Sequence, residues 1–247
     1  MNDRPTRDCQ CPRANHQHGT RPRLLDLYCC AGGAAVGYHR AGFDVVGVDI
    51  NPQPRYPFEF HQADALEFLA AHGHEFDAIH ASPPCQTYNR TKTLHSNEHP
   101  DLVGVTREAL EATGKPWVIE NVVGAPLINP LRLCGSEFDM IAPDVDGVPL
   151  KMIRHRLFES NVPLEGNGGC RHRNDIQTAS AYGAGGGWTP RHRDNPDRRG
   201  GYIPHIDVLR ELLNVHWTNK HELSQVVPPV FAKHIGKQLI KHLKETP

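Results

Sequence analysis

Short apolar runs alternate with helical patterns along most of this chain, and this alternation limits the possible folds more than any other feature. Strands are predicted near residues 24–28, 44–48, 76–80 and 117–119. Helical patterns follow near residues 34–41, 65–72, 102–113 and 204–213. Buried strands joined by crossover helices are typical of a mostly parallel sheet covered on both faces. The sequence therefore predicts an α/β fold with its chemistry beyond the carboxyl ends of the strands.

The chain has 247 residues, enough for one substantial core and a small additional lobe. We expect residues 1–22 to form a flexible tail and 23–160 to form a cofactor-binding and catalytic domain. Residues 161–204 are rich in glycine and arginine, a composition that favours loops, and they read either as a mobile insertion or as a compact target-recognition region. Residues 205–247 return to the catalytic domain, and the last helix, near 228–243, carries an apolar stripe.

Charge and cysteine content restrict the class of protein further. The net charge is −1, but residues 151–205 contain nine Lys or Arg and five acidic residues, an excess that could follow a phosphate backbone. No window contains eighteen apolar residues, so no membrane span is expected. The seven cysteines are an odd number and several adjoin apolar runs, so the sequence predicts a reducing, cytoplasmic location.

The N-terminal tail raises the question of a metal. Cys9, Cys11, His16 and His18 offer soft ligands that could bind zinc, but their spacing is not one of the usual finger patterns. No metal site is therefore predicted.

The run Ser82-Pro83-Pro84-Cys85-Gln86 carries the strongest chemical signal. Proline cannot continue a buried strand, so Cys85 is expected in the loop beyond the strand end. Glu120 ends a second apolar strand and is followed by Asn121, which makes it a candidate general acid. A lone cysteine is usually an inert buried residue, and a lone glutamate is usually a solvated strand end. The hypothesis of a catalytic site therefore depends on Cys85 and Glu120 occurring together.

A turn of small residues containing Gly32 and Gly33 lies between the first strand and the first helix. Such a turn lets a ligand approach the backbone and the helix N-terminus. Asp49 ends the next strand, where an acid can accept hydrogen bonds from ribose hydroxyls. Asp64 is placed to bind an adenine amino group, or to cap the following helix.

In this order, Asp26-Leu27-Tyr28, Gly32-Gly33, Ser82 to Gln86, Glu120-Asn121-Val122 and Arg154-His155-Arg156 resemble the motifs of the cytosine-C5 DNA methyltransferases, and in particular compact phage or prophage members. The resemblance covers about 23–160 and 221–243. It implies a Rossmann-like fold and S-adenosylmethionine as cofactor. The chain departs from the family at Cys30, where glycine is usual, which concerns cofactor affinity, and has Tyr28 in place of phenylalanine.

The resemblance implies roles for three groups of residues. The catalytic group is Cys85, Glu120, Arg154 and Arg156. The cofactor-binding group is Asp26, Tyr28, Cys30, Ala31, Gly32, Gly33, Asp49, Ile50, Asp64, Ala65 and Pro83. The residues expected to bind nucleic acid are Gln86, Arg90, Lys92, Asn121, Arg171, Arg173, Arg191 and Arg193.

The implied reaction is methylation of cytosine at carbon 5 in double-stranded DNA, through attack of Cys85 on carbon 6 of a base flipped out of the helix. A tRNA cytosine-C5 methyltransferase shares these motifs, and a non-catalytic DNA-binding relative would also keep the fold. An amino-group methyltransferase would place an aromatic residue where this chain has Cys85. A monomer is expected, and a restriction enzyme that shares the site is a plausible partner by analogy alone.

Overall fold

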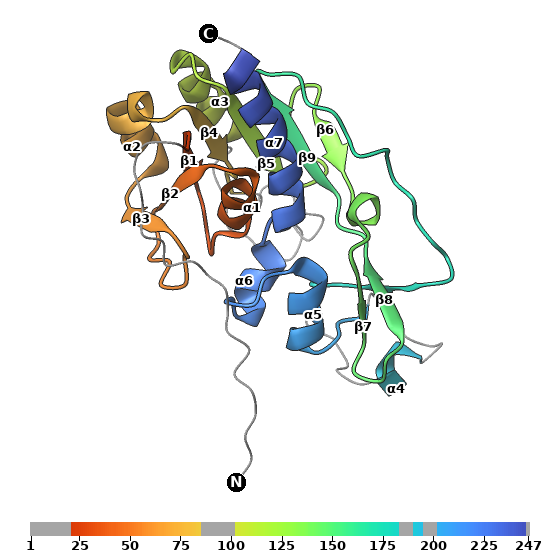
Figure 1. The fold of residues 1–247 in the computed structure, drawn as a ribbon. Helices are drawn as coiled ribbons and strands as arrows, with labels where there is room; N and C mark the ends of the chain where they lie inside the picture. The colour runs from red at the N-terminus through yellow and green to blue at the C-terminus, as the bar shows by residue number, and fades with distance from the viewer. Residues whose placement is uncertain (1–20, 85–101, 183–189, 195–201, 246–247) are drawn as a thin grey trace.

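The computed structural model describes residues 21–84, 102–182, 190–194 and 202–245. Its main sheet joins seven of the described strands in the order β3-β2-β1-β4-β5-β9-β6 (Figure 1). These are β1 Arg23–Leu27, β2 Asp44–Asp49, β3 Glu59–Gln62, β4 Ala78–Ala81, β5 Trp117–Asn121, β6 Leu131–Leu133 and β9 Arg156–Ser160. β1 to β5 pair in parallel, whereas β9 is antiparallel to both β5 and β6. The strand order reverses between β1 and β4, and ligands of open α/β sheets bind beside such a reversal.

Alternate residues of the parallel strands enter two different hydrophobic clusters. One face contributes Leu24, Val45, Ala78 and Val118 to the cluster that also contains residues of α1 Gly33–Ala41 and α7 Pro229–Glu245. The other face contributes Leu25, Val46, Ile79 and Ile119 to the cluster with α2 Ala65–His72 and α3 Val103–Ala112. The period of two along each strand thus covers both faces of the sheet.

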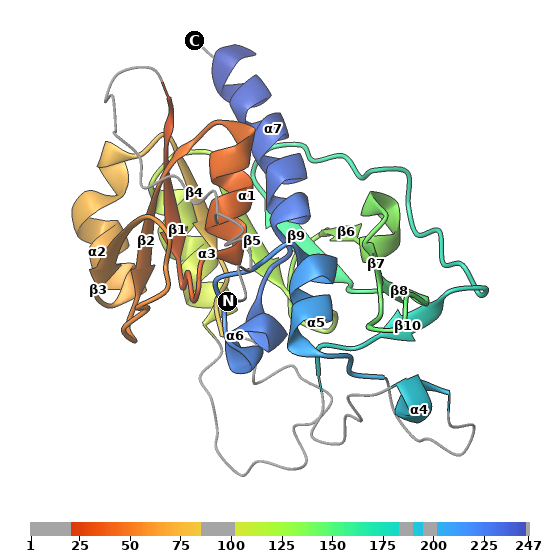
Figure 2. The ribbon, with the colours of Figure 1, turned by 60° about the horizontal axis from the view of Figure 1, so that its bottom comes forward.

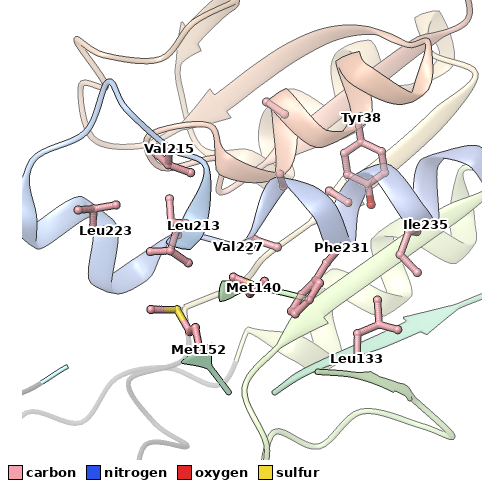
Figure 3. Packing of buried hydrophobic residues seen from close by; sticks show 14 of the residues in the cluster. Tyr38, Leu133, Met140, Met152, Leu213, Val215, Leu223, Val227, Phe231 and Ile235 are labelled. Atoms are coloured by element: carbon pink, nitrogen blue, oxygen red, sulfur yellow. The ribbon is translucent and has the colours of Figure 1, made fainter. Parts of the chain in front are cut away.

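α1 and α7 lie side by side on one face of the sheet (Figure 2), and glycine allows their close approach. A Cβ atom on Gly37 would lie 2.3 Å from the Pro229 carbonyl oxygen. A Cβ atom on Gly236 would lie 2.8 Å from the Cβ of Ala41. Phe231 and Ile235 of α7 point into the core beside Tyr38 and Leu133 (Figure 3). The apolar stripe predicted for the last helix is therefore core packing.

A smaller lobe adjoins the main sheet. It contains a sheet in the order β10-β8-β7, formed by β7 Ile141–Pro143, β8 Pro149–Met152 and β10 Gln177–Ala179. The helices α4 Pro190–Arg193, α5 Ile206–Leu213 and α6 Lys220–Gln225 follow. Met140 and Met152 belong to the same hydrophobic cluster as Phe231, so the lobe shares the main core (Figure 3). The first strand of this smaller sheet, β7, precedes residue 161, where the sequence predicts the start of the target-recognition region.

The predicted central elements are confirmed, with shifts of a few residues at their ends. The sequence missed β3, β6, β7, β8, β9, β10, α4 and α6, together with the short 3₁₀ helices η1 Gly73–Glu75 and η4 Gly135–Phe138. Most of the predicted tail lies outside the described residues, but the Arg21 side chain donates hydrogen bonds to the carbonyl groups of His39 and Gly42. Among the described helices, none has the length and hydropathy needed to cross a membrane.

Candidate active site

The carboxyl ends of four parallel strands bring the predicted site residues to one edge of the sheet. Leu27 of β1 pairs with Ala81 of β4, and Ala81 pairs with Ile119 of β5. Ser82 and Glu120 therefore lie side by side just beyond the pairing. Because β9 runs antiparallel to β5, its first residue, Arg156, lies at the same edge. Four of the predicted residues lie outside the described part of the structure: Cys85, Gln86, Arg90 and Lys92. The described segment 21–84 ends directly before Cys85.

Glu120 and Arg156 form a buried ion pair at this edge. Nε of Arg156 lies 2.8 Å from Oε1 of Glu120, and the two side chains are 7% and 6% exposed. Burial raises the pKa of Glu120 above its usual value, although Arg156, Ser82 and Arg154 act in the opposite direction. A raised pKa favours the protonated form of a carboxyl group, which is the form that a general acid requires.

A chain of hydrogen bonds leads from α1 to Glu120. The Tyr38 hydroxyl lies 2.9 Å from Nδ1 of His80, and Nε2 of His80 lies 3.0 Å from Oγ of Ser82. Oγ of Ser82 donates to Oε2 of Glu120 at 3.0 Å. Since the Ser82 proton is used for Glu120, His80 must donate from Nε2 and accept from Tyr38 at Nδ1. Burial lowers the pKa of His80 to about 3, so the neutral ring required by this assignment is the stable form.

Tyr182 joins the small lobe to the catalytic edge. Its hydroxyl accepts a hydrogen bond from Nη2 of Arg156 at 3.2 Å. The guanidinium group of Arg154 lies over its ring, with Cζ 4.9 Å from the ring centroid, a cation–π contact. Nη2 of Arg154 also donates to the Ser224 carbonyl group at 2.7 Å. The two arginines predicted as catalytic thus lie at the site, and Arg154 is held by contacts to other parts of the chain.

Sequence reasoning missed Tyr38, His80, Ser82 as a hydrogen-bonding residue, and Tyr182. The one available signal was His80, a polar residue inside the apolar run Ala78-Ile79-His80-Ala81, because a fully buried histidine requires partners for both ring nitrogens. Tyr182 carried no signal, since only the folded structure brings the small lobe to Arg154.

Asn121 has a different position from the one expected for a nucleic-acid contact. It is 2% exposed, and its Nδ2 donates to the Pro83 carbonyl oxygen at 3.0 Å. Its Oδ1 accepts from the backbone N–H of Val122. The residue therefore fixes the start of the segment that leads to Cys85, and its contact with nucleic acid stays a prediction.

The cofactor side of the site lies at the ends of β1 and β2. Oδ2 of Asp49 accepts from the backbone N–H of Cys30 at 3.1 Å, and Oδ1 accepts from that of Asn51 at 2.9 Å. Tyr28 and Cys30 adopt positive φ angles of 55° and 45°. A left-handed backbone at position 30 explains why glycine is usual there, because side chains with a Cβ are strained in this region.

The other predicted cofactor residues fall into three environments. Ala31, Gly32 and Gly33 form the buried turn before α1, and a Cβ on Gly32 would lie 2.8 Å from Cδ of Pro57. Ile50 is 65% exposed. Asp64 is the N-cap of α2, and its Oδ1 accepts from Leu66 and Glu67. The capping alternative is thus realised, with Ala65 buried beneath it and Pro83 buried in the loop after β4.

Asp26 lies beneath this turn, not at its surface. It is 1% exposed, and Tyr56 donates to its Oδ2 at 3.4 Å. Burial raises the pKa of Asp26 to about 8. The structure thus places Asp26 in the interior, and its contact with the cofactor stays a prediction.

These features fit S-adenosylmethionine. The Asp49 carboxylate retains free acceptor capacity beyond its two backbone bonds, and the exposed Ile50 beside it offers an apolar surface for an adenine ring. No phosphate-binding group is needed for this cofactor, and the acid at the end of β2 is suited to ribose hydroxyls.

Of the four arginines predicted to bind nucleic acid in the described residues, two form ion pairs with acidic residues of this chain. Arg193 is buried and pairs with Asp144, Asp146 and Asp194, contacts that hold this part of the lobe together, and its contact with nucleic acid stays a prediction. Arg173 pairs with Asp175 at the surface. Arg171 and Arg191 are exposed and stay predicted contacts.

No family model matches the chain. The type II methyltransferase M.XorII of Xanthomonas oryzae is 30% identical over 123 residues, which cover 42% of this chain and 29% of that protein. The match thus spans less than a third of the relative. Among solved structures, S. pombe Dnmt2 is similar with a TM-score of 0.54 and 12% identity, over 90% of this chain and 99% of that chain.

Two further solved structures have the same fold. A protein named as a DNA modification methyltransferase encoded within an E. coli prophage aligns with a TM-score of 0.53 and 15% identity, over 91% of this chain and 99% of that chain. Entamoeba histolytica EhMeth aligns with a TM-score of 0.52 and 12% identity, over 91% and 99%. These three structures are under 25% identical to this chain and show that it shares their fold, and the M.XorII match adds similarity in sequence to a methyltransferase.

Proposed function

We propose that this protein methylates cytosine at carbon 5 in DNA, through a transient bond between Cys85 and carbon 6 of the base. One observation carries the proposal: the buried Glu120–Arg156 pair lies beside Ser82 at one edge of the sheet. Ser82 precedes Cys85 by three residues in the sequence. Activation of a pyrimidine ring requires a protonated acid and a nucleophilic thiol acting on the same base. Glu120 is the proposed acid, and Cys85 is the proposed nucleophile.

Carbon 5 of cytosine is too weak a nucleophile to attack a methyl donor without activation. In the proposed reaction the Cys85 thiolate adds to carbon 6 while protonated Glu120 donates a hydrogen bond or a proton to ring nitrogen 3. Electron density then moves to carbon 5, which takes the methyl group. S-adenosylmethionine, when bound, supplies that group on a sulfonium that leaves as a neutral thioether. Loss of the carbon 5 proton to solvent expels the thiolate, and a proton given to ring nitrogen 3 returns to Glu120.

The other residues of the edge position these two groups. Arg156 holds one carboxyl oxygen of Glu120 and Ser82 holds the other, so the acid has a fixed direction. The positive charges of Arg154 and Arg156 favour a thiolate nearby. Asn121 fixes the Pro83 carbonyl group and thereby the start of the loop that carries Cys85.

DNA is proposed as the substrate from the excess of basic residues between Lys151 and His205, together with the DNA methyltransferase named among the similar structures. Because carbon 6 is shielded in a stacked duplex, the target base would leave the helix. The experiment incubates the purified protein and labelled S-adenosylmethionine with duplex DNA of mixed sequence and with tRNA, followed by bisulfite sequencing of both.

The proposal expects 5-methylcytosine in the DNA and none in the tRNA. A Cys85→Ser variant should lose transfer and keep its cofactor affinity in calorimetry, and a Cys11→Ser variant controls for thiol removal elsewhere. Methylation restricted to tRNA would replace the substrate assignment. Full activity of Cys85→Ser would overturn the mechanism.

A further inference from the structure

Two cysteines and two histidines outside the proposed catalytic site converge on one point. Cys134, His155, Cys170 and His172 place their ligand atoms within 4.8 Å of one another. Nε2 of His172 lies 3.2 Å from Sγ of Cys134, and Nε2 of His155 lies 3.3 Å from Sγ of Cys170. We propose that these four side chains bind a structural Zn²⁺ ion.

The spacing of the ligand atoms suits a tetrahedral site. Zn–S bonds of about 2.3 Å and Zn–N bonds of about 2.0–2.1 Å place neighbouring ligand atoms about 3.3–3.8 Å apart. The His172–Cys134 and His155–Cys170 separations of 3.2 Å and 3.3 Å are close to the lower end of that range. A tetrahedral set of two sulfur and two nitrogen ligands is characteristic of zinc.

Hydrogen bonds among the two cysteines and two histidines would stabilise this cluster only weakly. Thiols are weak donors and weak acceptors, so four such groups gain little by packing together at a surface. Cys134 is buried, His155 is partly buried, and Cys170 and His172 are exposed. An ion could therefore enter from solvent and close the site over the buried sulfur.

The four ligands come from three separate parts of the fold. Cys134 follows β6 and begins η4, and His155 directly precedes β9. Cys170 and His172 belong to the segment 161–176, all of it described, which contains neither a helix nor a strand. A long irregular segment in a compact domain needs an anchor, and a metal ion here would tie it to the main sheet.

The surroundings already orient the ligands. Oγ of Ser136 lies 3.1 Å from Sγ of Cys134 and accepts from the backbone N–H of Arg171. Glu137 accepts from the backbone N–H of Cys134 and from that of Asn167. Such outer contacts hold metal ligands in place. They also connect the Cys134 turn directly to the segment that carries Cys170 and His172.

One of the four proposed zinc ligands is adjacent in sequence to two residues of the proposed catalytic site. His155 lies between Arg154 and Arg156, so an ion on His155 would fix the backbone that carries both arginines. Arg171 and Arg173 flank His172 in the same way. The zinc proposal does not depend on the methylation proposal, and its test measures metal content and protease resistance.

The experiment expresses the full chain with added zinc, purifies it under reducing conditions without chelator, and measures bound metal by mass spectrometry. About one zinc ion per chain is expected, as for closed structural sites. Cys170→Ser and His172→Ala should lose most of it. A Ser136→Ala variant should weaken zinc binding about tenfold by removing a supporting contact.

A Cys9→Ser, Cys11→Ser double variant is the matched control, because the tail holds the other cysteine and histidine group of the sequence. It should keep its zinc. Metal-stripped wild type titrated with Co²⁺ should develop the visible absorption of tetrahedral cobalt and a thiolate charge-transfer band, and Cys170→Ser should not. Because the cobalt spectrum is recorded on wild type, the test of tetrahedral metal binding does not depend on how well a variant folds.

Limited trypsin digestion tests the anchoring role. Zinc-loaded wild type should resist cleavage after Arg171 and Arg173, and removal of the ion by a chelator should expose both positions. The proposal is wrong if wild type binds no zinc or tetrahedral cobalt, or if zinc is lost in the tail variant and kept in Cys170→Ser. A Cys134–Cys170 disulfide without metal in freshly purified protein would also overturn it.

Discussion

At the scale of single residues, the hydrogen-bond chain from Tyr38 to Glu120 explains why a histidine occupies a buried strand. His80 supplies a donor to Ser82 and an acceptor to Tyr38, and only the neutral ring does both. Ser82 in turn directs its proton to Glu120. The protonation state of the proposed acid is therefore coupled to residues that never contact the base.

Ser82→Ala tests this coupling. The Ser82 hydrogen bond lowers the pKa of Glu120, so its removal should raise that pKa further. Because the protonated form is the active one in the proposed mechanism, the alkaline limb of the kcat/KM profile should move to higher pH. Stability should fall by about 1–3 kcal/mol, since the His80 N–H loses its acceptor.

Ser160→Ala is the control for that profile. Ser160 lies on β9 and donates to the Trp117 carbonyl group, at the other end of the β5–β9 pairing from Glu120. Its replacement should leave the pH limb in place. An unchanged limb in Ser82→Ala would show that Ser82 does not set the protonation of the acid.

Cys30→Gly tests the strain in the cofactor turn. At a φ of 45°, removal of the Cβ should relieve strain, and the gain should exceed the entropic cost of glycine, for a net increase in stability of up to about 1 kcal/mol. Cys30→Ala keeps the Cβ and should show no gain. Thermal unfolding measures both, and a Cys30→Gly variant less stable than Cys30→Ala would contradict the account.

At the scale of elements, α1 is the part that connects the cofactor turn to the rest of the protein. Its N-terminus follows Gly32, and its residue Tyr38 begins the hydrogen-bond chain. α7 packs against it through Gly37 and Gly236. A shift of α1 would therefore disturb both the cofactor side and the proposed acid.

Gly37→Ala should show how tightly these helices meet. The new Cβ would overlap the Pro229 carbonyl group and lie 2.6 Å from the Cβ of Ala232, so the helices must separate, at a cost of about 1–3 kcal/mol. Gly104→Ala in α3 is the matched control, because a Cβ there meets nothing within 4 Å. It should stabilise by up to about 1 kcal/mol. Equal effects of the two substitutions in urea unfolding would refute the packing argument.

The central strands and main helices were predictable because their apolar periods are long and uninterrupted. β3, with the sequence Glu59-Phe60-His61-Gln62, is a polar edge strand and gives no such signal. β9 contains Arg156 and Glu159, both buried by partners distant in sequence. The site motifs were visible, but Tyr182 and the roles of Asn121 and Arg193 depend on the register of strands and on ion pairs that no local pattern encodes.

At the scale of the whole molecule, two buried ionisable groups give stability a distinctive dependence on pH. The pKa of Asp26 is raised from 3.8 to about 8, so folding favours its protonated form, and stability falls as the pH rises from about 4 to 8. The pKa of His80 is lowered from 6.5 to about 3, so stability falls as the pH drops from about 6.5 to 3. Between pH 4 and 6.5 the two slopes oppose each other.

Asp26→Asn should separate the two contributions. The variant keeps the shape of the side chain and removes its titration. The difference in unfolding free energy, variant minus wild type, should rise by about 1.4 kcal/mol per pH unit between pH 4 and 8. Urea unfolding at several pH values measures it, and a difference that does not change with pH would show that Asp26 is ionised in the folded protein.

The central claim is that Cys85 becomes covalently bonded to carbon 6 of cytosine. Duplex DNA containing 5-fluorocytosine tests it most directly, because fluorine at carbon 5 cannot leave as a proton does and the adduct persists. Incubation with S-adenosylmethionine should yield a denaturation-resistant complex of protein and DNA, with the modified peptide mapping to Cys85. The absence of any such complex, on DNA that the same preparation methylates when unfluorinated, would contradict the account.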